Sequence, residues 1–440
     1  MSSLDPAAVV VALALSAVLP GAAYAPKPEP PTADRPPEAP RGRPQATNAQ
    51  AKEPAPGAAP PRAGPLEAVT LFLCGDVMTG RGIDQVLPRP CDPRIHEGYM
   101  TSAKGYVRLA ERAHGRIPTP VDFAYIWGEA LGVLRQVRPN VRIINLETSI
   151  TRSNSYWRGK GIHYRMSPQN VRCIPAAGID VCVLGNNHVL DWGYAGLAET
   201  LKTLAAARVK IAGAGKDLAA AQAPAVCQIA PDRRVLVFAF GCPSSGIPRT
   251  WAAGGGRAGV HFLPAIGDAA ARRVAALVRK HRRGGDIVVA SIHWGGNWGY
   301  PVPEQQRRFA HKLVEAGGVD LIHGHSSHHA KGIEVHRGKL ILYGCGDLIN
   351  DYEGISGREE FRSDLGLMYF ASVAPSTGQV KALRMVPMQM RRFQLRRASP
   401  QDAKWLQKAL DRECRRLRAR VELAEDNALR LEWQQGSPGR

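Results

Sequence analysis

Side chains that can bind metal ions follow directly after five separate apolar runs in this sequence. In chain order they are Asp76 after 71–74, Glu147 after 141–144, Asn187 and His188 after 181–184, His293 after 287–292, and His325 and His328 after 319–322. Each run is short and rich in Val, Ile and Leu, which is typical of a buried strand. Because the carboxyl ends of strands in an open α/β sheet border one crevice, we expect these side chains to share a single site.

The chemistry of these side chains indicates a site for divalent metal ions. Carboxylate, amide and imidazole ligands suit Mn, Fe or Zn, and no cysteine is placed to form a sulfur-rich site. One or two such ions would polarise a phosphoryl or acyl oxygen and generate hydroxide at neutral pH. The pattern therefore predicts a metal-dependent hydrolase.

Single members of this set also have explanations that require no metal. Asp76 can cap the turn after its strand, Asn187 can bond its own backbone in an Asx-turn, and His293 alone is more often a hydrogen-bonded core histidine. The four imidazoles within 323–329 are harder to explain in this way, because burying them without partners is costly. We therefore favour the metal interpretation for the combined pattern.

The elements that must position these side chains alternate along the chain. Amphipathic stretches such as 197–207 and 268–281 lie between the apolar runs, and strands that alternate with helices predict a layered α/β domain. We place this domain at 67–395, with helices packed outside the sheets. For 396–440 the sequence predicts a charged, exposed helical extension that opens at Ser399.

Residues 1–25 have features of a secretory signal peptide, because an apolar run at 7–19 precedes the small-residue pattern Ala23-Tyr24-Ala25. The run is too short to span a membrane comfortably. Asp5 and the lack of Lys and Arg before the run argue against a signal, so a mis-assigned start or a disordered leader is the alternative. Residues 26–66 are dense in Pro and Ala and predict a disordered linker that acts as an extended tether.

Composition restricts the classes of partner. The chain of 440 residues is 44% hydrophobic, which suffices for a globular core, and its formal net charge is +20. This charge favours phosphate-bearing substrates, acidic polymers or an anionic membrane. Nucleic acid is disfavoured, because aromatic and basic residues are not interleaved as in a binding platform. The basic stretch 412–420 is best interpreted as a solvated helix face, and the eight cysteines lack CxxC spacing, so their pairing stays open.

A longer set of motifs lies, in order, between residues 68 and 352. The motifs are Gly75-Asp76-Val77-Met78 with Arg81, Asn145-Leu146-Glu147-Thr148, Asn186-Asn187-His188 with Asp191 and Gly193, His293-Trp294-Gly295, Gly324-His325 with His328, Ile333-Glu334, and Leu342-Tyr343-Gly344-Cys345-Gly346-Asp347. In order and spacing, these motifs resemble the CapA family of poly-gamma-glutamate capsule synthesis proteins. That family is similar to calcineurin-like metallophosphatases.

The resemblance implies a metallophosphatase-like, four-layer α/β sandwich in which two mixed sheets are flanked by helices. It also implies an extracytoplasmic protein, secreted, periplasmic or membrane-associated, that helps to make, export or anchor an anionic polyglutamate. Carried over by position, the metal ligands are Asp76, Glu147, Asn187, His293, His325 and His328. His188 is then the proton donor, Asp191 orients its other ring nitrogen, and Arg81 engages an anionic group of the substrate.

Departures from the family pattern indicate a distinct subgroup. Met78 stands where metallophosphatases have the His of an Asp-x-His pair, so one of two metals is expected to be weakly held or absent. Ser326 and Ser327 interrupt the last histidine motif, and Cys345 and Asp347 are expected to alter the pocket floor. These changes leave the substrate open.

Two functions therefore compete. The first is a phosphoesterase-like, metal-dependent hydrolase of the cell envelope that acts on a phosphoester or an anionic polymer. The second is a non-catalytic accessory protein that binds polyglutamate or its synthase and export complex, and the positive charge, the tether and the missing Asp-x-His pair favour it. The expected partners are the polymer or phosphoester, a capsule synthase complex and, peripherally, a membrane.

Overall fold

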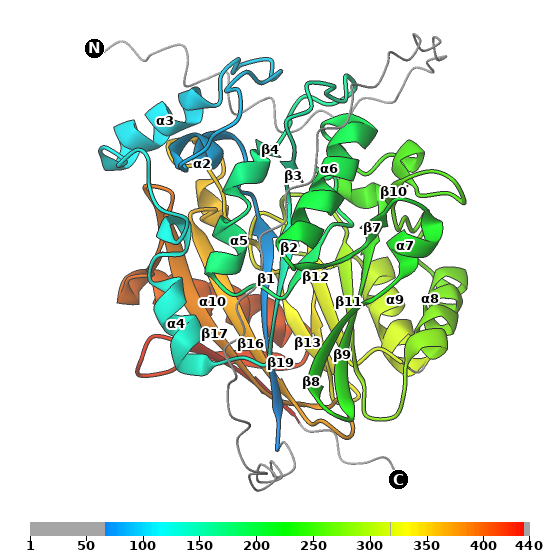
Figure 1. The fold of residues 1–440 in the computed structure, drawn as a ribbon. Helices are drawn as coiled ribbons and strands as arrows, with labels where there is room; N and C mark the ends of the chain where they lie inside the picture. Colours follow the sequence, from blue (N-terminus) through cyan, green and yellow to red (C-terminus); the bar gives the residue numbers. More distant parts are fainter. Residues whose placement is uncertain (1–66, 317, 435–440) are drawn as a thin grey trace, which may run out of the picture. The chain divides into compact units, whose positions relative to one another are not determined.

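The computed structural model describes residues 67–316 and 318–434 of the chain. The predicted signal at 1–25 and the predicted linker at 26–66 lie outside the described residues. Within the described part, strands and helices alternate along the chain, and two extended sheets dominate the fold (Figure 1).

The larger sheet has ten strands and is centred on β1 (Val69–Val77). β1 runs parallel to β2 (Val141–Leu146) on one side and antiparallel to β16 (Leu365–Val373) on the other, so the sheet is mixed. Beyond β2 lie β5 (Val181–Val183) and β6 (Lys210–Ala212), which are also parallel. The remaining strands of this sheet are β15 (Asp347–Ile349), β17 (Val380–Arg391), β18 (Gln394–Arg397), β19 (Ala419–Leu423) and β20 (Leu429–Trp433).

The smaller sheet has six strands and is mixed as well. In spatial order they are β13 (Ile333–His336), β14 (Lys339–Leu342), β12 (Leu321–His325), β11 (Ile287–His293), β9 (Arg233–Gly241) and β8 (Ala225–Ala230). The four inner strands run parallel, whereas the outer strands β8 and β13 are antiparallel to their neighbours. Two short ribbons pair β3 (Ser149–Ile150) with β4 (Arg165–Met166) and β7 (Ala214–Gly215) with β10 (Gly259–Val260).

Nine α-helices and five short 3₁₀ turns connect the strands of the described residues. The helices are α2 (Arg81–Val86), α3 (Lys104–His114), α4 (Ala130–Val137), α5 (Cys173–Ala176), α6 (Gly193–Ala206), α7 (Leu218–Gln222), α8 (Asp268–His281), α9 (Glu304–Glu315) and α10 (Pro400–Arg415). The 3₁₀ turns are η2 (Tyr125–Trp127), η3 (Pro168–Asn170), η4 (Pro243–Ser245), η5 (Arg249–Trp251) and η6 (Glu359–Phe361). In this part of the chain, no helix combines the length and the apolar character needed to cross a bilayer.

Alternation of side chains along the strands sets the layers of the fold. Along β1, Leu71 and Leu73 pack into a core between the two sheets, whereas Phe72 packs into a second core with α4, α5 and α6. On the smaller sheet, Val289 faces the inter-sheet core and Val288 packs with α8 and α9. The order is therefore helices, ten-stranded sheet, six-stranded sheet, helices. The prediction of a four-layer α/β sandwich with two mixed sheets is confirmed.

The C-terminal segment differs from the charged helix predicted for 396–440. Helix α10 ends at Arg415, and Ser399 caps its start by accepting a hydrogen bond from the Asp402 N–H at 3.1 Å. The chain then forms a hairpin of β19 and β20, which pairs with β17 and extends the larger sheet. Along 419–422 buried and exposed residues alternate, and this period of two favours a strand over a continued helix.

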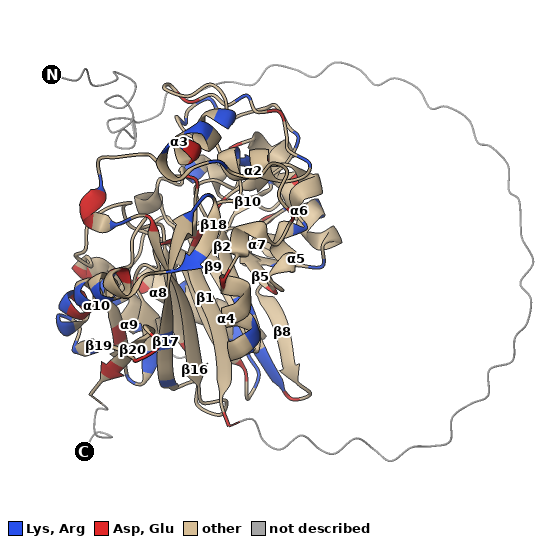
Figure 2. Cartoon of the chain, turned by 90° about the vertical axis from the view of Figure 1, so that its left-hand side faces the viewer, with Lys and Arg blue, Asp and Glu red and all other residues tan. Residues whose placement is uncertain are grey.

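Helix α10 is also partly buried, which corrects the prediction of an exposed helix. Leu406, Leu410 and Cys414 lie in the core between the sheets, together with Val421 and Leu431 of the hairpin. The outward face of α10 carries basic and acidic residues side by side (Figure 2). The C-terminal segment is therefore an integral part of the sandwich.

This integration predicts a large effect of shortening a side chain in α10. We expect Leu410→Ala, at a position only 1% exposed, to lower the free energy of unfolding by about 3 kcal/mol, because it leaves a cavity in the inter-sheet core. Leu423→Ala, at a position 39% exposed, is the matched control and is expected to stay within about 0.5 kcal/mol of the parent. Urea unfolding followed by circular dichroism measures both, and equal stabilities would contradict the role of α10.

All eight cysteines are free thiols, and seven of them are buried. Burial raises the pKa of the Cys242 thiol to about 12, so this group stays protonated and unreactive. The pairing that the sequence left open is therefore absent from the structure, and the buried cysteines act as small apolar side chains.

Candidate metal centre

Parallel strand ends bring the ligand-type residues to one region of the fold. β1, β2 and β5 are adjacent and parallel in the larger sheet, so Asp76 in the last residues of β1, Glu147 after β2 and Asn187 after β5 lie at the same edge. In the smaller sheet, His293 and His325 are register partners at the ends of β11 and β12. Contacts between the two groups join both sheets into one site.

Three of the predicted ligands form the centre of this site. Asp76, His293 and His325 each offer one atom, and these atoms all lie within 4.8 Å of one another. His293 Nδ1 lies 2.8 Å from His325 Nδ1, and His293 Nε2 lies 3.0 Å from Asn187 Oδ1. Glu147 Oε1 lies 3.7 Å from His293 Nε2. Side chains from five different strand ends therefore surround a common point.

Hydrogen bonds and a close backbone approach hold Asp76 in place. Asn145 Nδ2 donates to Asp76 Oδ1 at 2.7 Å, and the Ser326 N–H donates to Asp76 Oδ2 at 3.3 Å. The register of β1 shifts immediately before Asp76, a local irregularity that redirects a side chain. Only glycine fits at position 75, because a Cβ on Gly75 would lie 1.7 Å from the Gly346 carbonyl oxygen.

His188 approaches this centre from the side of Glu147. Its Nδ1 lies 2.6 Å from Asp191 Oδ2, and its ring stacks on Tyr164 with a centroid separation of 3.8 Å. The other ring nitrogen, Nε2, lies 3.9 Å from Glu147 Oε1. Asp191 therefore orients the imidazole through one nitrogen and leaves the other toward the centre.

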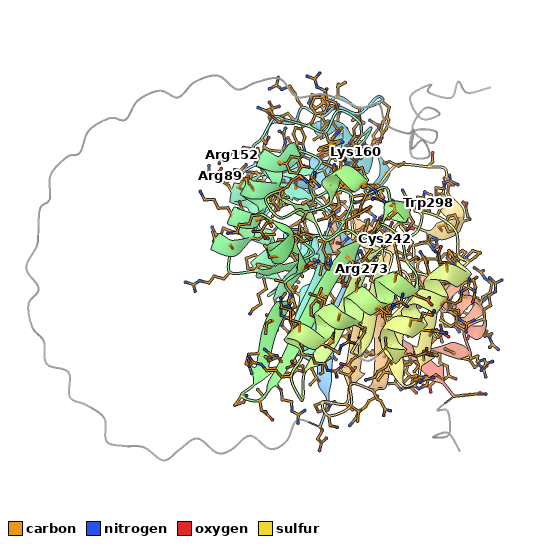
Figure 3. The ribbon with its side chains drawn as sticks, turned by 90° about the vertical axis from the view of Figure 1, so that its right-hand side faces the viewer. Arg89, Arg152, Lys160, Cys242, Arg273 and Trp298 are labelled. Carbon is orange, nitrogen blue, oxygen red and sulfur yellow. The ribbon has the colours of Figure 1, made fainter. Side chains whose placement is uncertain are left out.

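Lys160 also belongs to the site, although no motif or spacing in the sequence indicates it. It lies in the loop between β3 and β4 (Figure 3), and its Nζ donates to Asp191 Oδ1 at 2.5 Å and to the Asn187 backbone carbonyl. The same Nζ lies 3.3 Å from His188 Nδ1. The Lys160 ammonium therefore balances the charge of the Asp191 carboxylate. This contact depends on the path of the loop in the tertiary structure.

Burial of acidic groups at the centre perturbs their protonation. Burial, together with the nearby Asp347 carboxylate, raises the pKa of Asp76 to about 7. Burial, followed by repulsion from Asp76, raises the pKa of Glu147 well above its usual value. Clustered buried acids are unfavourable without a compensating charge, and a divalent cation at this point would supply it.

The imidazoles of the centre are held neutral. Burial lowers the pKa of His293 and of His325 well below the usual value, and the neighbouring histidines lower it further. Burial, followed by the Lys160 ammonium, lowers the pKa of His188 in the same direction. Neutral imidazole is the form that ligates metal ions, so the donor set fits a divalent cation of the Mn, Fe or Zn type.

His328 lies beside the centre but is engaged by another acid. Its Nδ1 lies 3.0 Å from Asp347 Oδ2. Burial opposes protonation of this ring, yet Asp347 raises the pKa of His328 above its usual value. Asp347 is itself the register partner of Asp76 across β15 and β1. The sequence indicated Asp347 only as a change in the pocket floor, and the structure adds it to the site.

Arg81, predicted to contact the substrate, is buried in an ion-pair network of the protein. Its Nη1 donates to Glu97 Oε1 at 3.1 Å and to the Tyr106 hydroxyl at 2.8 Å. Its Nε donates to Asp351 Oδ2 at 3.2 Å, and the side chain is 2% exposed. The guanidinium is thus fully engaged by neighbouring groups, and the geometry gives no support to a substrate contact by Arg81.

The two remaining histidines of the run 323–329 have other partners. His323 Nε2 lies 2.7 Å from the Cys74 carbonyl oxygen, and its Nδ1 lies 3.1 Å from Ser291 Oγ. The His329 ring stacks on Phe361 with a centroid separation of 4.5 Å. Neither ring belongs to the group of ligand atoms at the centre.

Comparison with known proteins relates this chain to bacterial capsule synthesis proteins. The sequence matches the family described as "Bacterial capsule synthesis protein PGA_cap" over residues 70–352. It is 48% identical over 371 residues to a probable polyglutamine synthesis accessory protein of Mycobacterium tuberculosis (strain ATCC 25618 / H37Rv). That match covers 84% of this chain and 97% of the mycobacterial protein.

A more distant relative and a solved structure extend the comparison. The PGA biosynthesis protein CapA of Bacillus subtilis (strain 168) is 27% identical over 208 residues, which cover 47% of this chain and 52% of that protein. Among solved structures, a novel phosphatase from Mycoplasma pneumoniae aligns with 73% of this chain and 94% of its own, at 10% identity and a TM-score of 0.39.

Proposed function

Because this chain belongs to the PGA_cap family of bacterial capsule synthesis proteins, we propose that it is a metal-dependent hydrolase of the cell envelope. Its substrate is an anionic polymer such as polyglutamate, or a phosphoester linked to that polymer. Its partners are then the polymer and the capsule synthase complex, close to the membrane surface.

One observation carries this proposal: buried ligand-type side chains from both sheets meet at one point. The atoms offered by Asp76, His293 and His325 lie within 4.8 Å of one another, and Asn187 and Glu147 border the same point. Buried groups of this kind are retained where they hold a charge or perform chemistry, since their burial otherwise destabilises the fold.

In this proposal, each residue of the site has a separate role. A divalent cation held by Asp76, His293 and His325 would supply Lewis-acid activation of a bound oxygen. Asp191 holds His188 through Nδ1, so Nε2 accepts a proton at the reacting side and returns it to the leaving group. Lys160 stabilises the Asp191 carboxylate behind His188. Because Met78 is buried and offers no hard ligand, we expect one firmly held cation.

A second candidate function is a non-catalytic accessory role. The mycobacterial relative that covers 84% of this chain is described as an accessory protein, and Met78 replaces a metallophosphatase ligand. In that case the protein binds polyglutamate or its synthase complex without cleaving the polymer. Polyglutamate binding that is lost at high salt, but survives His293→Ala, would favour this candidate.

The proposed hydrolase predicts bound metal and metal-dependent turnover. The full-length protein, loaded with Mn, Fe or Zn and dialysed, is expected to retain about one ion per chain by mass spectrometry of the metal. Chain-length analysis of poly-γ-glutamate and a nitrophenyl phosphodiester assay should then show cleavage that a chelator abolishes. His281→Ala, in a histidine of the outer helix α8, is the matched control and should keep both properties. A protein with neither bound metal nor turnover would exclude the hydrolase.

A further inference from the structure

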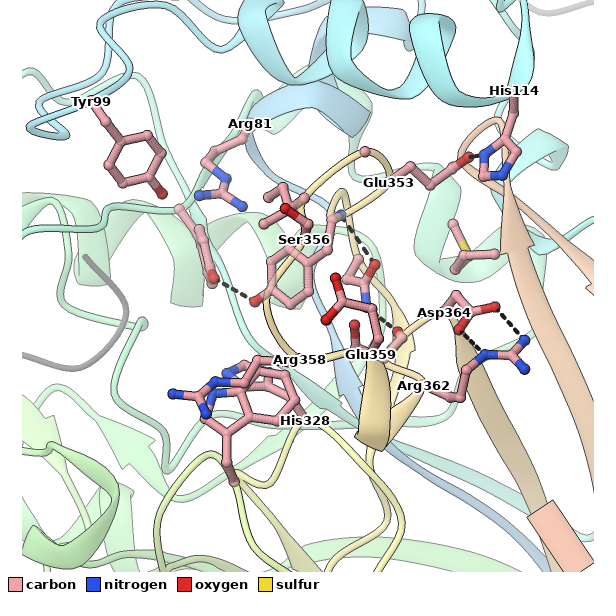
Figure 4. A pocket seen from close by; sticks show the side chains of 18 residues that line it. Arg81, Tyr99, His114, His328, Glu353, Ser356, Arg358, Glu359, Arg362 and Asp364 are labelled. Carbon is pink, nitrogen blue, oxygen red and sulfur yellow. Dashed lines mark hydrogen bonds and ion pairs between the residues drawn. The ribbon is translucent and has the colours of Figure 1, made fainter. Parts of the chain in front are cut away.

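A pocket of about 280 Å³ lies beside the candidate metal centre (Figure 4). Its wall includes His328, Trp298, Tyr352 and Tyr164, and Tyr164 is the ring on which His188 stacks. This volume is near the lower end of the range for small-ligand sites. The pocket therefore suits the end or a side group of a chain molecule that reaches the centre.

Three arginines line this pocket, and two of them are neutralised by the protein itself. Arg81 pairs with Glu97 and Asp351, and Arg362 pairs with Asp364 and Asp402. The positive charges of these two residues are thus neutralised by carboxylates of the protein.

Arg358 is the exception among these arginines. Across the described residues 67–316 and 318–434, its guanidinium has no carboxylate within ion-pair distance and makes no hydrogen bond, and no dashed line meets it in Figure 4. The side chain is only partly exposed. The positive charge of Arg358 is therefore not neutralised by the protein and is available to an anion in the pocket.

Packing places this charge on the wall nearest the histidines. The Arg358 guanidinium lies over the Trp298 ring, 5.6 Å from its centroid, and Trp298 packs against His328 at a centroid separation of 5.2 Å. Figure 4 shows Arg358 and His328 among the side chains that line the pocket, with Arg81 well apart from Arg358. An anionic group held by Arg358 would therefore lie in the same pocket as His328, with the Trp298 ring in contact with both side chains.

The loop that carries Arg358 is anchored to the same aromatic cluster. The turn η6 follows Arg358 directly, and Phe361 at its end packs against Trp298 and Tyr300, each at a centroid separation of 5.3 Å. Gly357 precedes the arginine with φ of 107°, a conformation that side chains rarely adopt. The position of the guanidinium is thus set by a defined turn and an aromatic anchor.

From these observations, we infer that Arg358 recognises the anionic group of the substrate in this pocket. The planar guanidinium fork matches the paired oxygens of a carboxylate or a phosphate, and the Trp298 ring supports its flat face. Arg358 thereby takes the task that the sequence suggested for Arg81. The inference rests on the proposed function for the choice of substrate, whereas binding of the anion requires no turnover.

Calorimetric titration of the full-length protein in chelator tests this inference. The probes are a tetramer of γ-linked glutamate, which carries carboxylates, and phenyl phosphate, which carries a phosphate. Arg358→Gln is expected to weaken binding of the preferred probe by roughly tenfold to a hundredfold, because charge-assisted hydrogen bonds are lost. Arg358→Lys should recover only part of the affinity, since a lysine keeps the charge but lacks the fork.

Arg273→Gln is the matched control, because it removes the same charge from an exposed position on the outer helix α8, away from Trp298 (Figure 3). It should bind like the parent. Equal weakening by both substitutions, or no binding of either probe to the parent, would overturn the inference. The probe that binds more tightly identifies the anion as carboxylate or phosphate. If cleavage is absent but Arg358→Gln still weakens binding, the hydrolase proposal fails and the role of Arg358 stands.

Discussion

Replacing His188 with alanine is expected to lower the rate of polymer or diester hydrolysis by about 10²- to 10⁴-fold, while the bound metal is retained. His188 lies outside the group of Asp76, His293 and His325, and its Nε2 faces Glu147 at 3.9 Å. Its removal therefore deletes a proton-transfer group without deleting a central ligand. Steady-state kinetics at saturating metal, with the metal content measured on the same samples, provides the test.

Two further variants test whether His188 acts in the reaction or only in the structure. Asp191→Asn is expected to lose part of the rate, because the amide no longer fixes the tautomer through the 2.6 Å contact with Nδ1. It should also shift the pH–rate profile, which a purely structural defect would not do. His281→Ala, in a histidine of the outer helix α8, should match the parent. Turnover by His188→Ala at the parental rate would remove His188 from the mechanism.

Replacing Asp76 with asparagine is expected to weaken metal binding roughly a hundredfold or more, yet to stabilise the metal-free protein. The pKa of Asp76 is raised from 3.8 to about 7, chiefly by burial, so the folded state favours the protonated acid. Between these two values the folded protein binds more protons than the unfolded chain, and stability falls as pH rises. Above pH 7 this single group destabilises the fold by roughly 4 kcal/mol, and asparagine avoids the effect because it cannot ionise.

Urea unfolding in chelator at pH 5 and pH 8 measures this effect. The parent should lose stability between the two values of pH, whereas Asp76→Asn should lose much less and exceed the parent at pH 8. Adding Mn should then stabilise the parent and leave the variant unchanged, since only the parent binds the ion tightly. Asp232→Asn, at an exposed side chain, is the control for a general change of charge. Lower stability of Asp76→Asn than of the parent at pH 8 in chelator would contradict the account.

These expectations link the stability of the metal-free fold to the function proposed for it. The acids at the centre are stable when protonated or when a cation neutralises them, so an empty site destabilises the protein at neutral pH. We therefore expect metal binding to increase the stability of the fold, because the proposed site is assembled from both sheets. Replacing Arg358 should not affect metal binding or this pH dependence, because Arg358 lines the neighbouring pocket and not the centre.

Much of the site was predictable because its residues follow strands that the sequence indicates strongly. Apolar runs before Asp76, Glu147 and His293 correspond to β1, β2 and β11, and parallel strands must end at a common edge. This rule is sufficient for Asp76 and Glu147, which share the larger sheet, whereas His293 joins them only because the smaller sheet packs against the larger one. The orientation of His188 by Asp191 is similarly local, since the two lie one helical turn apart in the sequence.

The residues whose roles the sequence did not predict are those whose roles depend on distant partners. Lys160 reaches Asp191 through a loop without regular structure, and Asp347 meets Asp76 only because β15 pairs with β1. Arg81 was predicted to contact the substrate, but in the structure it forms ion pairs with Glu97 and Asp351. The hairpin after α10 has a local signal in the alternation of residues 419–422, but its place in the larger sheet depends on the pairing of β20 with the distant strand β17.

The sequence by itself therefore determined the layered α/β class and the set of ligand-type residues, since both are encoded in short periods of apolar and polar side chains. The tertiary structure decided which charges are neutralised and which remain available. Whether a charge is neutralised depends on desolvation and on pairing with groups far apart in the chain. The residues next to it in the sequence therefore do not predict it. The contrast between Arg81, which is surrounded by buried acids, and Arg358, which lines the same pocket without an acidic partner among the described residues, follows from this difference.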